Sequence, residues 1–327
     1  MSLKNFAQAA NNRLERLMPL IAPAGVFLGF FLPEIFKHLR PFVPFLFGMM
    51  TLSGALKLRA AEFGKTIRNP VPILVFFVSS RVLMPLCALF VSSFFFKSSP
   101  DTVTGFVLLF SGPVAVSSFI WVVIFKGDKA LCLTLILLDT LLAPFFMPGT
   151  VSLLMGAKVS INFYGIALSL VMMIVIPTIT GVTLNETSRS KIPSLVCPFL
   201  DPLSKICLML VIAANTSPIS GVVKLSDPKV WAIAGVCAFL CCAGFLLSRL
   251  AAAAVKCDRE KSAAILFSGG LRNISSVSTV AVTFFPEAVA LPAILGIMSQ
   301  QTVSAVMVKV LFRGTGSKEQ KKNGSST

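Results

Sequence analysis

Ten long apolar stretches, separated by short segments that hold most of the basic residues, constrain this chain more than any other feature. A membrane-spanning helix needs about 20 mostly apolar residues to cross about 30 Å of hydrocarbon. No ten-residue alternating pattern of the kind found in membrane strands is present, and an open sheet edge cannot be satisfied in lipid. The sequence therefore predicts an all-α, polytopic membrane protein with about ten transmembrane helices, at residues 17–36, 41–57, 71–96, 103–125, 129–154, 160–184, 198–217, 229–249, 262–285 and 288–312.

Composition excludes a water-soluble fold. Of 327 residues, 55% are hydrophobic and only 13% are charged, whereas about a quarter of a soluble domain is charged. The net charge of +16 would suggest nucleic acid if the basic residues shared a soluble face, but they lie between apolar stretches, so we expect the lipid bilayer as partner and no nucleic acid. The eight cysteines form no CxxC pair, so neither a zinc site nor a disulfide framework is indicated, and no metal or cofactor is expected.

The basic residues also predict the orientation. With the N-terminus inside, twenty of the 29 Lys and Arg residues lie in inside segments, six lie in outside segments and three lie within spans. An excess of Lys and Arg on the cytoplasmic side is the rule for membrane proteins. We therefore expect a multi-pass protein of the inner (plasma) membrane with both termini cytoplasmic, residues 1–16 forming the N-terminal segment and residues 314–327 a disordered tail.

Two short stretches recur 157 residues apart: Phe110-Ser111-Gly112 as Phe267-Ser268-Gly269, and Pro41-Phe42 as Pro198-Phe199. Copies of five spans each, at 17–154 and 160–312, would insert with opposite orientation because five is odd. Inverted repeats are typical of secondary transporters. Gly112-Pro113 and Gly269-Gly270 lie in mid-span and predict two interrupted helices, which point to a binding site, although such residues also allow close helix packing.

Four ionisable residues lie well inside spans: Arg81, Asp139, Lys205 and Arg272. A charge at mid-bilayer costs at least ~2.5–3.5 kcal/mol, so each is a functional hypothesis. Asp139 could pair with Arg272, or act as a proton carrier that couples transport; Arg272 or Arg81 could bind the carboxylate or sulfonate of an anionic substrate. The alternatives without a transport role are a static ion pair and, for Lys205, a side chain that extends to the interface.

The chain resembles the bile acid:sodium symporter superfamily over nearly its whole length. The likeness is carried by the order and spacing of Phe47-Gly48-Met49-Met50, Met84-Pro85-Leu86, Lys126 to Leu131 followed by Leu141-Leu142-Ala143-Pro144, and Ser268 to Asn273. The resemblance implies a core domain in which the broken spans 103–125 and 262–285 cross, a panel domain beside it, and a substrate cavity open to one membrane face. Related folds carry organic anions, auxin-like acids, arsenite or protons.

The sequence departs from that family at the positions that hold two sodium ions in sodium-coupled members. Relative to the family pattern, Glu is replaced by Ser268 and Gln by Arg272, while Ser118-Phe119, Cys132, Ile136 and Ser80 stand at other ligand positions. Sodium prefers oxygen ligands, and an arginine is a permanent positive charge. We therefore expect that the usual two-sodium mechanism is not used.

These observations predict a secondary active transporter of a small or amphipathic organic anion that works by alternating access, with H+ or Na+ as the possible coupling ion. The alternatives are a sodium-coupled symporter of the bile-acid type with a modified cation site, and an exporter of an oxyacid such as arsenite. An enzyme is not expected, because the only histidine, His38, lies in an outer loop and Asp139 has no second deep carboxylate. Asp139 is the candidate coupling residue, and the predicted site comprises Ser111, Gly112, Pro113, Ser118, Ser268, Gly269, Gly270, Arg272 and Asn273, with Arg81, Gln300 and Gln301 as secondary candidates.

Overall fold

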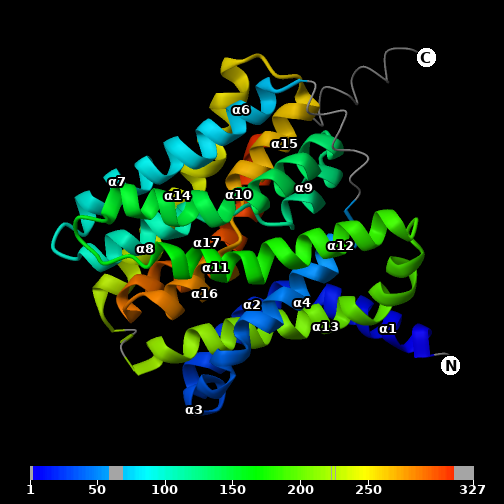
Figure 1. Cartoon of the computed structure of the whole chain (residues 1–327). Coiled ribbons are helices and arrows are strands. Elements are labelled where there is room, and N and C mark those ends of the chain that lie inside the picture. Colours follow the sequence, from blue (N-terminus) through cyan, green and yellow to red (C-terminus); the bar gives the residue numbers. More distant parts are fainter. Residues whose placement is uncertain (1–2, 59–68, 222, 225, 313–327) are drawn as a thin grey trace.

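The computed structural model describes residues 3–58, 69–221, 223–224 and 226–312, and within these ranges it contains helices and no extended strand (Figure 1). The first half comprises α1 (Leu3–Arg16), α2 (Met18–Phe31), α3 (Pro33–Phe36), η1 (Lys37–Phe42), α4 (Val43–Ala55), α6 (Val71–Phe77), η3 (Val78–Leu83), α7 (Met84–Phe95), α8 (Pro100–Ser111), α9 (Ser118–Ile124) and α10 (Lys129–Met155). The second half comprises α11 (Phe163–Leu170), η4 (Val171–Val175), α12 (Ile176–Thr187), α13 (Lys191–Thr216), η5 (Ser217–Gly221), α14 (Pro228–Ala254), α15 (Arg259–Gly270), α16 (Ile274–Phe284) and α17 (Glu287–Phe312).

The all-α membrane fold is confirmed, and helices occupy each of the ten predicted ranges. Among the described residues, five continuous helical segments are long and apolar enough to cross a membrane: Val71–Phe95, Lys129–Met155, Phe163–Thr187, Lys191–Gly221 and Pro228–Ala254. A bent pair, Ala7–Glu15 with Leu20–Phe31, would make a sixth. The ranges 103–125 and 262–285 are each interrupted, α8 from α9 and α15 from α16. The full count of ten spans and the division into five plus five remain predictions.

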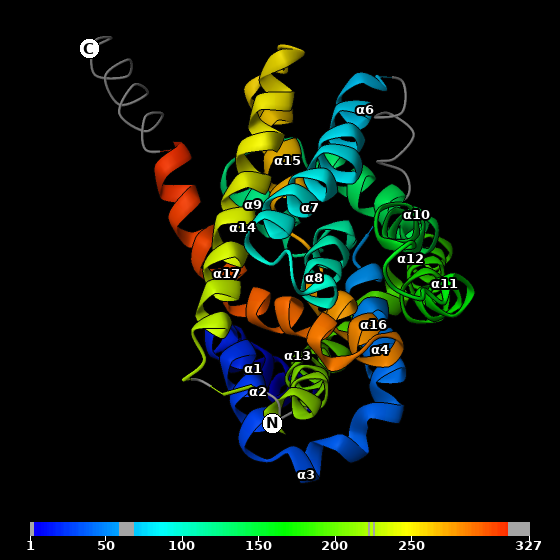
Figure 2. The same cartoon turned by 90° about the vertical axis from the view of Figure 1, so that its left-hand side faces the viewer.

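The helices pack as two groups. In the first, which we call the panel group, α13 packs on α1, α2 and α4, and α4 on α12. In the second, the core group, α14 packs on α15 and α17, α8 on α7, α10 and α17, and α16 on α17. Figures 1 and 2 show α2, α4 and α13 together on one side of the molecule, with the helices around α8, α14 and α15 on the other.

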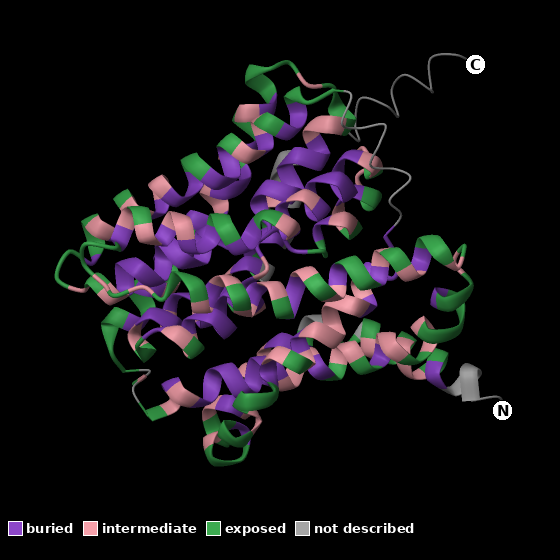
Figure 3. Cartoon of the chain, viewed as in Figure 1, coloured by how far each residue is buried: buried purple, intermediate pink, exposed green. Residues whose placement is uncertain are grey.

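Burial differs between the interior and the outer surface of the core group. Residues 102–111 of α8 and residues 263–270 of α15 are all buried (Figure 3). The outward faces of α7 and α10 instead expose large apolar side chains, among them Phe94 at 81% and Leu153 at 85%. Apolar residues on the outside of a helix bundle are the arrangement that a lipid solvent favours.

Residues 3–16 of the predicted N-terminal segment form α1, which packs along α13. The Lys205 ammonium donates hydrogen bonds to Asn11 and Glu15 of this helix, the second over 3.2 Å. Lys205 thus binds polar groups of α1 and lies away from the buried charges described below. The predicted disordered tail, 314–327, lies outside the described residues.

Candidate functional site

Two helix breaks meet at the centre of the core group. Gly112 ends α8 with extended backbone angles (φ −63°, ψ 158°), which is the conformation that a following proline imposes, and Pro113 has no N–H to continue the helix. The second break has no proline; Leu271 is extended (φ −109°, ψ 119°) after Gly270. The interrupted helices predicted at these glycines are therefore present.

The broken segments pair with each other in a single antiparallel bridge between Val114 and Arg272. The Ala115 N–H donates to the Leu271 carbonyl over 3.1 Å, and the Asn273 N–H donates to the Pro113 carbonyl over 2.7 Å. A break in a buried helix frees backbone groups that cost free energy unless they find partners. Each break here supplies partners for the other, which fixes the crossing.

Close packing at the crossing accounts for two of the glycines. A Cβ on Gly112 would lie 2.3 Å from Cγ2 of Val277, and a Cβ on Gly269 would lie 2.0 Å from Oγ of Ser248. No side chain fits at either position without displacing a neighbour. Gly112 and Gly269 therefore bring α8 and α15 into contact with other helices, which is the packing alternative that the sequence allowed.

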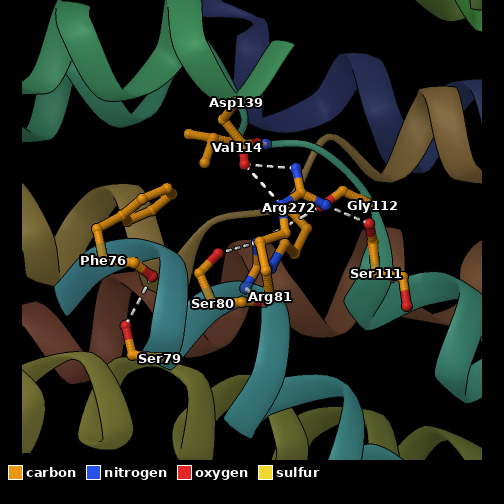
Figure 4. A network of polar contacts seen from close by, with 9 residues as sticks. All are labelled: Phe76, Ser79, Ser80, Arg81, Ser111, Gly112, Val114, Asp139 and Arg272. Carbon is orange, nitrogen blue, oxygen red and sulfur yellow. Dashed lines mark hydrogen bonds and ion pairs between the residues drawn. The ribbon is translucent and has the colours of Figure 1, made fainter. Parts of the chain in front are cut away.

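The carboxylate of Asp139, fully buried on α10, is bound by Arg81 (Figure 4). Arg81 Nη2 and Nε lie 2.5 and 2.7 Å from Oδ1, and the Val114 N–H donates to Oδ2 over 2.7 Å. Arg81 lies in the π-helical segment η3, a type of irregularity that is frequent at functional sites. The prediction that Asp139 pairs with Arg272 was wrong. Arg81 binds the carboxylate from η3, whereas the Arg272 guanidinium donates hydrogen bonds to Ser80 and not to Asp139.

Arg272 is a second buried guanidinium, 2% exposed, and its hydrogen-bond acceptors are neutral (Figure 4). It donates to Ser80 Oγ over 2.7 Å, to the Ser80 carbonyl over 3.1 Å and to the Gly112 carbonyl over 3.4 Å. Across the described ranges, no carboxylate lies within ion-pair distance of Arg272. The crossing thus holds two buried guanidinium groups and one carboxylate.

Both guanidinium groups bind carbonyl oxygens that the first break releases. Arg81 Nη1 donates to the Ser111 carbonyl over 2.5 Å and to the Gly112 carbonyl over 3.3 Å, and Arg272 shares the latter. Carbonyl groups at a helix C-terminus carry the negative end of the helix dipole and attract cations. In this chain fixed side chains provide those cations.

Gln300 of α17 holds the backbone at the second break. Its Oε1 accepts from the Arg272 N–H, and its Nε2 donates to the Arg272 carbonyl, both over 2.9 Å. The side chain is 6% exposed, so it replaces the partners that both groups lost when the helix ended. The side chain of Gln301, the other secondary candidate, lies outside what the structure describes.

The remaining predicted residues form a small polar cluster and a cap. Cys132 Sγ lies 3.9 Å from Ser118 Oγ and 3.5 Å from Ser268 Oγ, so it joins the two broken spans. The Ser111 hydroxyl donates within its own helix to the Val107 carbonyl over 2.6 Å. The Asn273 side chain caps α16 by accepting from the Ser276 N–H over 3.3 Å. Within the described chain, no three His, Cys, Asp or Glu residues are grouped to hold a metal ion.

Comparison with known proteins agrees with this architecture. Residues 43–225 match the Sodium Bile acid symporter family. The chain is 34% identical to "Uncharacterized protein YbaS" of Bacillus subtilis (strain 168) over 90% of this chain and 97% of that protein. It is 26% identical to "Probable sodium/metabolite cotransporter BASS3, chloroplastic" of Arabidopsis thaliana over 84% of this chain and 63% of that protein. It is also 26% identical to "Arsenical-resistance protein Acr3" of Alkaliphilus metalliredigens (strain QYMF), over 48% of this chain and 49% of that protein. With more than half of its residues matched and a relative aligned along nearly its full length, the chain belongs to the sodium bile acid symporter family, a family of transporters.

Proposed function

We propose that this protein is a secondary active carrier that moves a small or amphipathic organic anion across the inner (plasma) membrane by alternating access, without sodium as the coupling ion. The proposal depends chiefly on one observation: two buried guanidinium groups and one carboxylate at the crossing of the broken helices. The name of the BASS3 relative refers to a metabolite and to sodium. The proposal takes over the metabolite as the kind of substrate, but it does not take over sodium as the coupling ion.

The carbonyl oxygens of Ser111 and Gly112 already accept hydrogen bonds from arginines, which disfavours a sodium ion at the crossing. Such oxygens are typical ligands of a hard cation. Guanidinium nitrogen atoms lie 2.5 to 3.4 Å from them, and an arginine remains protonated. A sodium ion at the same oxygens would have to displace these donors and approach two positive charges.

The charge balance at the crossing favours an anionic substrate. Asp139 neutralises Arg81, whereas Arg272 has neutral acceptors. The N-terminus of α16, capped by Asn273, begins immediately after Arg272, and helix N-termini favour negative groups. An organic carboxylate or sulfonate supplies the charge that would complete this arrangement.

Asp139 is the candidate for proton coupling. Protonation would remove the charge that pairs with Arg81, and it would weaken the acceptor of the Val114 N–H on the first broken span. A proton bound there would change the contacts between α10, η3 and the crossing.

Thermal unfolding of the detergent-purified protein tests the coupling ion, because a ligand that binds only the folded state raises the transition temperature. We expect the same Tm in sodium, potassium and choline, and a dependence on pH that Asp139→Asn removes. A rise in Tm specific to sodium would contradict the proposal and support the sodium-coupled symporter.

The same assay tests the substrate class with organic carboxylates and sulfonates, their neutral amides, and arsenite. We expect the anions to raise Tm, Arg272→Gln to remove the response, and Lys205→Gln, which lies away from the crossing, to keep it. Equal stabilisation by the neutral amides, or by arsenite alone, would contradict the organic-anion proposal, and the second result would favour the oxyacid exporter.

A further inference from the structure

Helix α16 belongs to the core group, but three elements on the panel side contact it: α13, η1, which packs on α13 and α4, and α11, which continues through η4 into α12. We count η1 and α11 with the panel group from here on. The Asn215 amide on α13 donates to Ser278 Oγ over 3.0 Å and to Thr279 Oγ1 over 2.9 Å. Arg40 of η1 donates to the Val282 carbonyl over 3.2 Å. These contacts recur along successive turns of α16, toward its C-terminal end.

A third contact comes from α11. A Cβ on Gly165 would lie 2.8 Å from Cε1 of Phe284, so the backbone of α11 packs directly on the last residue of α16. The charge distribution assigns η1, the start of α11 and the end of α13 to the same membrane face, the outer one. The panel group therefore contacts the C-terminal half of α16 near the outer membrane face.

The opposite end of α16 begins at the candidate site. Asn273 caps this helix, and its N–H binds the Pro113 carbonyl of the other broken span over 2.7 Å. A substrate that bound at the crossing would lie next to the first turn of α16. One helix thus connects the candidate site with the panel group.

The hydrogen bonds between Asn215 and α16 can break without leaving the hydroxyl donors of α16 unpaired. The Ser278 and Thr279 hydroxyl groups both donate to the Ser275 carbonyl, over 3.0 and 2.9 Å. They keep these bonds within α16 when Asn215 leaves, so opening leaves neither hydroxyl donor unpaired. With this contact formed, Asn215, Ser278 and Thr279 are each at most 2% exposed. A buried amide is costly without hydrogen-bond partners, so the Asn215 amide favours the position in which it binds the two hydroxyl groups.

We propose that Asn215, Ser278 and Thr279 form a gate that closes one membrane face between the panel and core groups and opens when the carrier changes its orientation. The proposal rests on alternating access in the proposed function, but its test needs no substrate. Asn185 provides a matched control, because its buried amide donates to the Leu58 carbonyl over 2.8 Å entirely within the panel group.

The experiment measures how fast a membrane-impermeant maleimide reacts with Ser275→Cys, a half-buried position in the first turn of α16. Reaction is followed from both faces, in intact cells and in inside-out vesicles, with the native cysteines alone as background. In the Asn215→Ala background we expect the rate to rise about fivefold or more from the outer face and to fall from the other, since each of the two buried hydrogen bonds that Asn215 loses shifts a two-state population by about this factor. Ser278→Ala with Thr279→Ala should have the same effect, and adding Asn215→Ala should change little further, because the residues share one contact.

Unchanged rates at both faces in folded variants, or an equal change with Asn185→Ala, would overturn the gate. Folding is checked by a monodisperse gel-filtration profile, and Asn215→Ser, a smaller change, replaces Asn215→Ala if the latter does not fold. Because labelling is independent of transport, failure of the anion assays leaves this result standing, and an unresponsive gate leaves the anion proposal standing.

Discussion

At the scale of single residues, the Arg81–Asp139 pair is the interaction whose loss we expect to cost most. Asp139→Leu leaves a buried guanidinium without its carboxylate, which destabilises a protein by about 3–5 kcal/mol. Arg81→Met combined with Asp139→Leu should recover part of that loss, because apolar side chains then replace both charges. Recovery stays partial since the Val114 N–H and the Ser111 carbonyl lose their partners.

Thermal unfolding of the two single variants and the double variant measures this coupling. Glu34→Ala serves as control: it breaks the exposed pair with Lys37, and its Tm should match the wild type. Strict additivity of the two core substitutions would show that Arg81 and Asp139 do not act as a pair.

Gln300 carries the second prediction at this scale. Gln300→Met keeps the length of the side chain but leaves the buried Arg272 N–H without its partner, which costs about 1–3 kcal/mol, while the Arg272 carbonyl keeps the hydrogen bond that it accepts from the Ile274 N–H over 2.9 Å. Thr302→Ala is the control on the same helix, because its exposed hydroxyl bonds only within α17. Equal melting temperatures for the two variants would mean that the Gln300 contacts do not support the break.

The sequence identified the buried charges but not their partners. Arg81, Asp139 and Arg272 stood out because apolar residues surround them. Which arginine meets the carboxylate depends on how η3 lies against α10, and that is a matter of tertiary packing. Composition also could not show that Gln300 faces a break 28 residues away.

At the scale of helices, the close approach of α8 to α16 gives a steric prediction. The backbone angles of Gly112 suit any residue, so Gly112→Ala should fail only because its Cβ would lie 2.3 Å from Val277 Cγ2. Overpacking of this kind costs about 1–3 kcal/mol. Val277→Ala in the same chain removes the clashing methyl groups, so the double variant should melt above Gly112→Ala. A double variant that melts below both singles would assign Gly112 a role other than close packing.

The start of α15 gives a prediction about pH. Asp258 caps this helix by accepting from the Lys261 N–H over 2.8 Å, and the Lys261 side chain donates to the same carboxylate over 2.6 Å. These bonds to Lys261 hold the pKa of the Asp258 carboxyl below its ordinary value. A lowered folded-state pKa stabilises the protein above the unfolded value of about 3.9, and this contribution is lost as the pH falls through the folded value.

Asp258→Ala should therefore lower stability at neutral pH by about 1 kcal/mol, the usual cost of a lost cap. Asp258→Asn keeps the cap and loses only the charge, so its Tm should lie slightly below the wild type at pH 7 and meet it only when the pH has fallen through the folded pKa of Asp258, below about 3.9. If the Tm of Asp258→Asn stayed below that of the wild type in acid as well, the ion pair with Lys261 could not be the cause of the difference.

The two breaks illustrate what local sequence can and cannot indicate about elements. Gly112-Pro113 predicted the first break by backbone chemistry alone. The second contains no proline, and it was predicted because it repeats Phe-Ser-Gly at the same offset. The pairing of Val114 with Arg272 joins residues far apart in the chain, so no local pattern could have predicted it.

At the scale of the whole molecule, the predicted repeat would relate the two halves of the bundle. In that prediction, residues 157 apart in the sequence occupy equivalent places in two copies of five spans, and an odd number of spans reverses the second copy in the membrane. Ser98, between α7 and α8, corresponds to Val255, between α14 and α15. Figure 1 places these two turns at opposite ends of the helices.

The inverted arrangement predicts that equivalent positions are reached from opposite faces. In intact cells a membrane-impermeant maleimide should label Ser98→Cys, which the charge distribution assigns to the outside, and should label Val255→Cys only after permeabilisation. Both positions are exposed, so accessibility within the protein does not limit either reaction, and the native cysteines again provide the background. Labelling of both from the same face would contradict an odd number of spans between them and with it the inverted repeat. The reverse pattern would retain the repeat and place both termini outside, against the twenty-to-six excess of basic residues.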